Sequence, residues 1–143
     1  MSTIKTNTLT GTTSAGSIVV TGEGGSTTTN LQQGLAKHWI FYEMNESTPT
    51  AADSLSHSSI TDNNNGCHTI TMSAIMATTD YCTLSGSGRG ASSAYAIVQM
   101  QMNQSAVEVP NTTTTYTFLG IENTNTTLTD FNTMSVGVFG DLA

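Results

Sequence analysis

The sequence predicts an all-β protein in which an extended N-terminal β arm or stalk precedes an antiparallel β-sandwich of jelly-roll-like form. Three observations lead to this prediction. Thr is the commonest residue of the 143, and its β-branched side chain suits a pleated strand. Only 9% of residues are charged, so charged helix formers are scarce. Apolar and polar residues alternate in short runs that Asn- and Gly-rich turns separate.

The first part of the chain, residues 1–36, is predicted to be an anchoring arm. Up to about residue 30 it has no aromatic residue, and its sizeable apolar side chains are few: Ile4, Leu9, Ile18, Val19 and Val20. Such a segment buries too little surface to offset its own ordering entropy. We therefore expect it to be disordered or to be ordered by other chains, with these five residues as assembly contacts.

A short helix is predicted over residues 31–36. Leu31, Leu35 and Ala36 follow Asn30, which is a favourable N-cap residue, although Gly34 weakens the pattern. The helix would act as a hinge between two differently built parts.

Residues 37–143 hold the predicted strands and core. Period-two patterns occur at residues 39–42, 67–76, 93–102, 115–121 and 134–139. Turn clusters separate them at residues 62–66, 85–90, 110–111 and 122–125. Five methionines fall on the faces predicted to be buried, where we expect them to pack: Met72, Met76, Met100, Met102 and Met134.

The strand at residues 39–42 carries large apolar groups on both faces. Trp39 and Phe41 lie on one face and Ile40 and Tyr42 on the other. Because one core covers only one face, we expect Trp39, Phe41 and Tyr42 to contact another subunit, most simply in a homotrimer.

The charge balance argues against nucleic acid as a partner. Three cations and ten carboxylates give a net charge of −7, so we expect no nucleic-acid binding.

No apolar run is long enough to cross a membrane, and the N-terminus lacks the basic-then-apolar order of an export signal. Cys67 and Cys82 do not have the C-x-x-C spacing of a redox or metal motif, and we expect both to be buried thiols.

The sequence offers weak signals for chemistry. Asp53 with Asp62, and the triplet Ser56-His57-Ser58, are the nearest candidates for catalysis, but neither lies in a strained nucleophile turn. We expect no enzyme activity, with Asp62 and Asn63 capping a turn.

The histidines His38, His57 and His68 are scattered, so no metal site and no cofactor are predicted. The alternation places His68 on the face of Ile70 and Met72, where we expect a half-buried ring with its hydrogen bonds satisfied.

Two stretches resemble a known family. The arm through Trp39, followed by DSLSHSSITDNNNGCHTITM, resembles small tail-fibre-like appendage proteins in the virions of marine tailed bacteriophages. The positions that fit the family pattern are Asp53, Ser54, Leu55, Ser58, Ser59, Ile60, Thr61, Asp62, Asn63 and Gly66. The resemblance covers about the first 75 residues and fades after Cys82.

This resemblance implies a virion protein, most often a trimer, with its N-terminus docked on other virion proteins and a β domain pointing outward. The domain would then contact a host-surface glycan or protein through loops at residues 85–90, 110–115 and 122–127. The side chains expected to face the receptor are Arg89, Tyr95, Asn111, Tyr116 and Asn125. A capsid decoration protein bound through the same arm remains the alternative.

Overall fold

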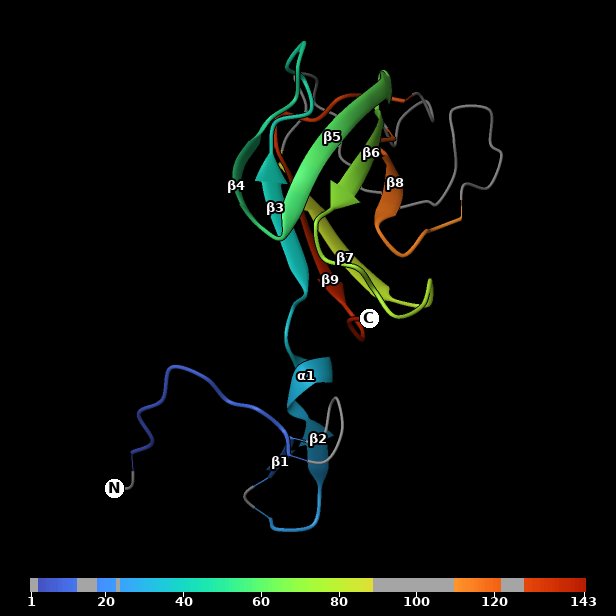
Figure 1. Cartoon of the computed structure of the whole chain (residues 1–143). Helices are drawn as coiled ribbons and strands as arrows, with labels where there is room; N and C mark the ends of the chain where they lie inside the picture. The colour runs from blue at the N-terminus through green and yellow to red at the C-terminus, as the bar shows by residue number, and fades with distance from the viewer. Residues whose placement is uncertain (1–2, 13–17, 23, 89–109, 122–127) are drawn as a thin grey trace. The chain divides into compact units, whose positions relative to one another are not determined.

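The computed structural model describes residues 3–12, 18–22, 24–88, 110–121 and 128–143 (Figure 1). The chain divides into an N-terminal unit, Met1–Leu35, and a C-terminal unit, Ala36–Ala143. The sequence patterns at residues 93–102 and 122–125 lie outside the described residues, as do Arg89, Tyr95, Met100, Met102 and Asn125.

The N-terminal unit is built on a small hairpin. Strands β1 (Val19–Thr21) and β2 (Thr28–Asn30) pair antiparallel, with Val19 opposite Asn30. Residues 3–12 are described without regular secondary structure. In place of the single extended β arm that the sequence predicted, the described part of this unit therefore has two three-residue strands.

The predicted helix is a single turn, α1 (Leu31–Gly34). The Asn30 side chain caps it by accepting a hydrogen bond of 3.2 Å from the Gln33 backbone N–H. Leu35 is already extended, so the helix ends two residues before the predicted boundary. Gly34 accounts for the early end, because glycine is a poor helix former.

In its described residues, the C-terminal unit contains two antiparallel sheets (Figure 1). The larger sheet has the order β4-β3-β9-β7, from β3 (His38–Tyr42), β4 (Ala51–Leu55), β7 (Cys82–Ser87) and β9 (Met134–Phe139). The smaller sheet has the order β5-β6-β8, from β5 (His57–Asn64), β6 (Cys67–Met72) and β8 (Thr115–Leu119).

One hydrophobic core draws on both sheets. The larger sheet contributes Ile40, Tyr42, Met134, Val136 and Val138, and the smaller sheet contributes Ile70, Met72, Tyr116 and Phe118. Period-two alternation produces this core, since β3 and β9 bury every second residue. The prediction of an all-β protein with antiparallel sheets is confirmed, whereas the jelly-roll form stays a prediction.

Three local predictions are wrong. Residues 85–87 belong to β7 and pair with β9, because their backbone groups complete the edge of the larger sheet. Asp62 and Asn63 lie in β5, and the turn is reduced to Asn65 and Gly66. Cys67 is buried as expected, but Cys82 is exposed because it begins a strand at the sheet edge.

The strand at residues 39–42 has one exposed and one buried face, and Tyr42 lies on the buried face, where the prediction of a subunit contact fails. Trp39 and Phe41 lie on the outer face of the larger sheet, with exposed fractions of 36% and 40%. Tyr42 is fully buried in the chain's own core, so it is not available to another subunit.

Candidate functional site

The turn between β5 and β6 is held by backbone contacts to distant parts of the chain. Gly66 has a φ of 68°, a left-handed conformation that favours glycine. Its carbonyl accepts a hydrogen bond of 2.7 Å from the Gly120 N–H, and the Gly120 carbonyl accepts one of 2.9 Å from the Thr129 N–H. The turn is therefore fixed against the end of β8 and the segment that leads to β9.

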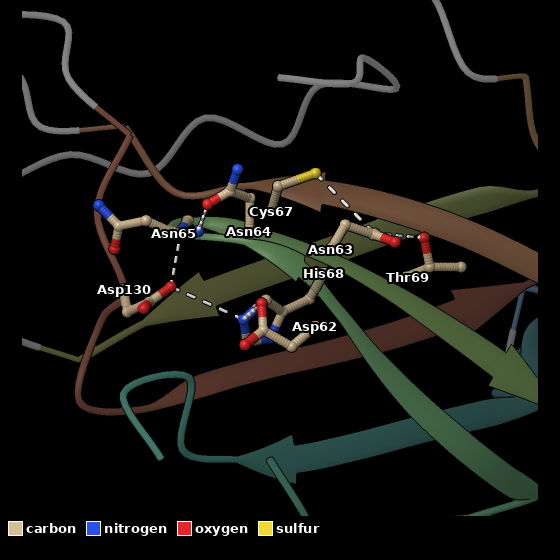
Figure 2. A network of polar contacts seen from close by, with 9 residues as sticks. Asp62, Asn63, Asn64, Asn65, Cys67, His68, Thr69 and Asp130 are labelled. Carbon is tan, nitrogen blue, oxygen red and sulfur yellow. Dashed lines mark hydrogen bonds and ion pairs between the residues drawn. The ribbon is translucent and has the colours of Figure 1, made fainter. Parts of the chain in front are cut away.

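Asp130, in that segment, completes the attachment (Figure 2). Its Oδ1 accepts a hydrogen bond of 2.5 Å from the Gly66 N–H. Asn65 adds a bond of 2.7 Å from its side-chain amide to the Leu128 carbonyl. These bonds bring Asp130 next to β6 although 64 residues separate it from Gly66.

His68 lies between two carboxylates (Figure 2). Its Nε2 is 3.7 Å from Oδ1 of Asp62, which is its cross-strand partner on β5, and 3.6 Å from Oδ1 of Asp130. Both separations are too long for a hydrogen bond. Among the described residues, neither ring nitrogen of His68 has a hydrogen-bond partner, although the side chain is fully buried.

Burial decides the protonation state of this histidine. Desolvation lowers the pKa of His68 below its usual value, and the charges of Asp130 and Asp62 oppose that shift only in part. The ring is therefore neutral at pH 7. The sequence-based prediction of a half-buried, satisfied imidazole is wrong, because the opposite sheet covers the ring while both carboxylates stay beyond bonding distance.

Tyr42 covers the ring from the larger sheet, with ring centroids 5.7 Å apart. Its hydroxyl is also buried, with no hydrogen-bond partner in the part of the chain that the structure describes. Burial, with a smaller contribution from Asp130, raises the pKa of Tyr42 well above its usual value. The site thus combines two neutral, unsatisfied buried groups with two carboxylates.

This arrangement can take up a proton, but it is poorly placed for catalysis. A general base must reach the proton it removes, whereas the His68 ring is shielded from solvent. In the described part of the chain, no three side chains among His, Cys, Asp and Glu are placed to hold a metal ion. The chemistry that the geometry supports is reversible protonation of His68 between Asp62 and Asp130.

A second buried histidine, His38 of β3, has both ring nitrogens satisfied. Its Nδ1 lies 3.2 Å from the Ser56 carbonyl, and its Nε2 lies 2.7 Å from the Tyr116 hydroxyl. The tautomer that satisfies both contacts donates from Nδ1 to Ser56 and accepts at Nε2 from Tyr116. The pair joins β3 of one sheet to β8 of the other.

Ser56 forms the corner between the two sheets. Its φ of 55° is unusual for a residue with a side chain. Its carbonyl accepts from both His38 Nδ1 and the Ser73 N–H, the latter at 2.8 Å. These bonds account for the strained conformation, and they give Ser56 a structural role where the sequence had suggested a candidate for catalysis.

The sequence-predicted site residues are distributed differently from expectation. Asp53 lies in β4 of the larger sheet and Asp62 in β5 of the smaller one. His57 begins β5, an edge strand of the smaller sheet. Asp130 was not singled out at all, and no short-range pattern could have revealed it, because it reaches His68 only through the folded chain.

Two predicted receptor-facing residues are buried, which is a correction. Tyr116 points into the core, where its hydroxyl meets His38, and only 2% of it is exposed. Asn111 is buried as well, with an exposed fraction of 8%. Neither can meet an outside ligand in this structure, because both side chains are buried, Tyr116 on the inner face of β8.

The N-terminal unit has a pocket of its own. It has a volume of about 370 Å³, and a hairpin strand and the helical turn line it through Val20, Leu31 and Leu35, with Gly22, Gly34 and residues 27–29. Val19 and Val20 remain about half exposed. Ile4 and Leu9, also predicted as assembly contacts, are exposed by 88% and 60%.

No family model, no curated protein and no solved structure matches this chain. In the described residues, no helix is long and apolar enough to cross a membrane.

Proposed function

We propose that the protein is a non-enzymatic structural protein of a bacteriophage virion. In this proposal it is a tail-fibre-like appendage, a homotrimer anchored by its N-terminal unit and exposing its C-terminal β unit for host-surface contact. The resemblance of the first 75 residues or so motivates the proposal. The observation that carries it is that four large apolar side chains are exposed in the N-terminal unit, which is distinct from the unit that holds the hydrophobic core: Ile4, Leu9, Val19 and Val20.

Such exposure is costly for an isolated chain. A two-stranded hairpin is marginal in water, and here all three residues of β1 are exposed. A partner that fills the pocket beside Val20 would bury its apolar wall. An anchoring contact with another virion protein therefore gives the N-terminal unit the burial that it lacks alone.

A matched pair of substitutions tests the anchor. Val20→Asp places a charge in the pocket wall, whereas Thr21→Asp places the same charge on the neighbouring exposed residue of β1. A buried, unpaired charge costs several kcal/mol, so we expect Val20→Asp to reduce the copies per purified particle at least tenfold. Thr21→Asp should leave the copy number unchanged. Quantitative mass spectrometry of purified particles measures both, and equal incorporation of the two variants would contradict the proposal.

The alternative is a capsid decoration protein bound to the shell through the same unit. The burial of Tyr116 and Asn111 favours it, because two of the five side chains assigned to receptor contact are unavailable. Gold-labelled antibody against the C-terminal unit distinguishes the two locations by electron microscopy. Label confined to the tail supports the appendage, and label over the whole shell supports decoration.

A further inference from the structure

The outer face of the larger sheet carries a continuous apolar surface, which we call the aromatic face: Trp39, Phe41, Leu55, Leu84 and Phe139. Trp39 lies opposite Leu55 on one side and Gly137 on the other, and Gly137 lies opposite Leu84. A Cβ on Gly137 would meet the Phe139 ring at 3.4 Å, so that ring lies on the same face.

The size of this face limits what can cover it. Leu55 and Leu84 are exposed by 43% and 60%, and with Trp39 and Phe41 they present on the order of 400 Å² of apolar surface. A stable interface buries about 800 Å² on each partner. The aromatic face is therefore too small for a face-to-face dimer, and it suits a single extended segment.

Charge further disfavours two C-terminal units facing each other. From residue 36 onward the chain has nine carboxylates against Lys37 and Arg89. Residues 1–22, in contrast, have no carboxylate, and Lys5 is their one cation. Asp53 is exposed on the aromatic face, as the cross-strand partner of Phe41. A segment that carries Lys5 is thus complementary to this face, whereas another acidic unit is not.

The segment at residues 3–10 is also long enough to cross the face. In a regular strand Ile4 and Leu9 would point to opposite sides, but the chain bends at Asn7, so the alternation is interrupted and both side chains can face the sheet. Ile4 and Leu9 are the large apolar side chains of this exposed segment, and five extended residues span at most about 18 Å. Crossing the sheet from β4 to β7 covers three strand spacings, or about 14 Å. Ile4 can therefore contact Leu55 and Trp39 while Leu9 reaches Leu84.

We propose that residues 3–10 of one copy bind across the aromatic face of a second copy, with Ile4 near Trp39, Lys5 beside Asp53 and Leu9 beside Leu84. This contact links copies of the chain through a segment that is exposed in the single chain. It does not depend on the virion role, and it can be tested with the purified full-length protein.

Trp39 reports this contact directly, because it is the single tryptophan of the chain. We expect its fluorescence emission to shift to shorter wavelength as the protein concentration rises, since the bound segment removes the ring from water. Ile4→Ser and Leu9→Ser should each raise the protein concentration at the midpoint of this fluorescence shift at least tenfold, and Thr10→Ser should leave it unchanged. A concentration-dependent shift that survives both substitutions would overturn the proposal.

The charge contact is tested by reversal. Lys5→Glu and Asp53→Lys should each raise the midpoint concentration, because each places like charges together. The double variant should restore association to within a few-fold of the unmodified protein. If the double variant remains as weak as the single ones, the proposed register on the sheet is wrong.

A cross-link identifies the two partners. Cys82 is exposed and lies on the same face as Leu84, two residues away. Leu9→Cys should therefore form a disulfide with Cys82 of another copy under mild oxidation, seen as a dimer or larger species on a non-reducing gel. Moving the thiol to the exposed residue Ser59 of the smaller sheet, as Cys82→Ser with Ser59→Cys, should abolish the product. A cross-linked monomer, or equal cross-linking at both positions, would overturn the proposal.

Discussion

Two buried histidines mark two regions of the same core with opposite properties. His38, at the start of β3, has a partner at each ring nitrogen, in the Ser56 carbonyl and the Tyr116 hydroxyl. His68 packs against Tyr42, at the other end of β3, and neither of its ring nitrogens has a hydrogen-bond partner within the described ranges. Both rings are fully buried, so burial alone does not distinguish them.

The difference shows what a buried histidine contributes in each setting. A satisfied ring joins the two sheets and specifies their alignment, since removal of one partner leaves the other buried and unpaired. An unsatisfied ring between two carboxylates stabilises little in its neutral form, although the two carboxylates partly offset the cost that burial imposes on its protonated form. The His38 region therefore fixes the two sheets against each other, whereas in the His68 region two carboxylates act on the ring.

The largest expected effect is at the turn that positions the His68 region. Gly66→Ala forces a side chain into a left-handed conformation and places its Cβ 2.5 Å from the Thr129 nitrogen and 2.7 Å from the Gly120 oxygen. Because both neighbours are backbone atoms, we expect a loss of about 3 kcal/mol or more in the free energy of unfolding.

Chemical denaturation measures that loss. Gly24→Ala is the matched control, because a Cβ there meets nothing within 4 Å. A loss at Gly66 no larger than that of the control would show that the turn does not hold Asp130 and His68 in place.

The same substitution in the two regions should have different effects. Tyr116→Phe removes the donor to His38 Nε2 and leaves that buried atom unpaired, which costs about 1–3 kcal/mol. Tyr42→Phe removes a hydroxyl that has no partner, so we expect a change of less than about 0.5 kcal/mol, or a small gain. Urea unfolding measures the loss of stability in both variants. Equal losses in the free energy of unfolding would contradict the contrast between the two regions.

The pH dependence of stability follows from the direction of the histidine shifts. Burial lowers the pKa of His38, His57 and His68 below the ordinary value of 6.5. The unfolded chain therefore binds protons first, and stability is complete above about pH 6.5 and falls as the pH drops towards the folded-state values. Thermal unfolding between pH 7.5 and pH 5 should show a falling melting temperature. A melting temperature that rises over this interval would contradict the buried, neutral assignment.

The smallest expected effect separates the two histidines by titration. Asp62→Asn and Asp130→Asn each remove a charge that raises the pKa of His68, so each should lower that pKa further and leave His38 unchanged. The amide oxygen at position 130 can still accept from Gly66, which keeps the turn intact. Histidine ring signals in an NMR titration give the readout, and equal shifts at both rings would mean that the carboxylates do not act specifically on His68.

Local patterns of this sequence were sufficient for β3, β6, β8 and β9 and for much of the core, but not for β4, β5 and β7. The alternation of Ile40 with Trp39, and of Val136 and Val138 with their neighbours, follows from the two-residue period of a strand. Asn30 indicated the helix start, because a capping side chain acts within three residues. These features depend on neighbours in the chain, and so composition and spacing determined them.

The partners of the buried polar groups depended on the tertiary structure. Asp130 reaches His68 and Gly66 across more than 60 residues, and Tyr116 meets His38 across 78. The same packing exposed Cys82 and buried Tyr42, because a residue at a sheet edge and a residue between two sheets can share one local pattern. The sequence by itself thus determined the strands that show a clear two-residue alternation. The packing of the two sheets decided where the other strands lie, which polar side chains are satisfied and which surface remains open.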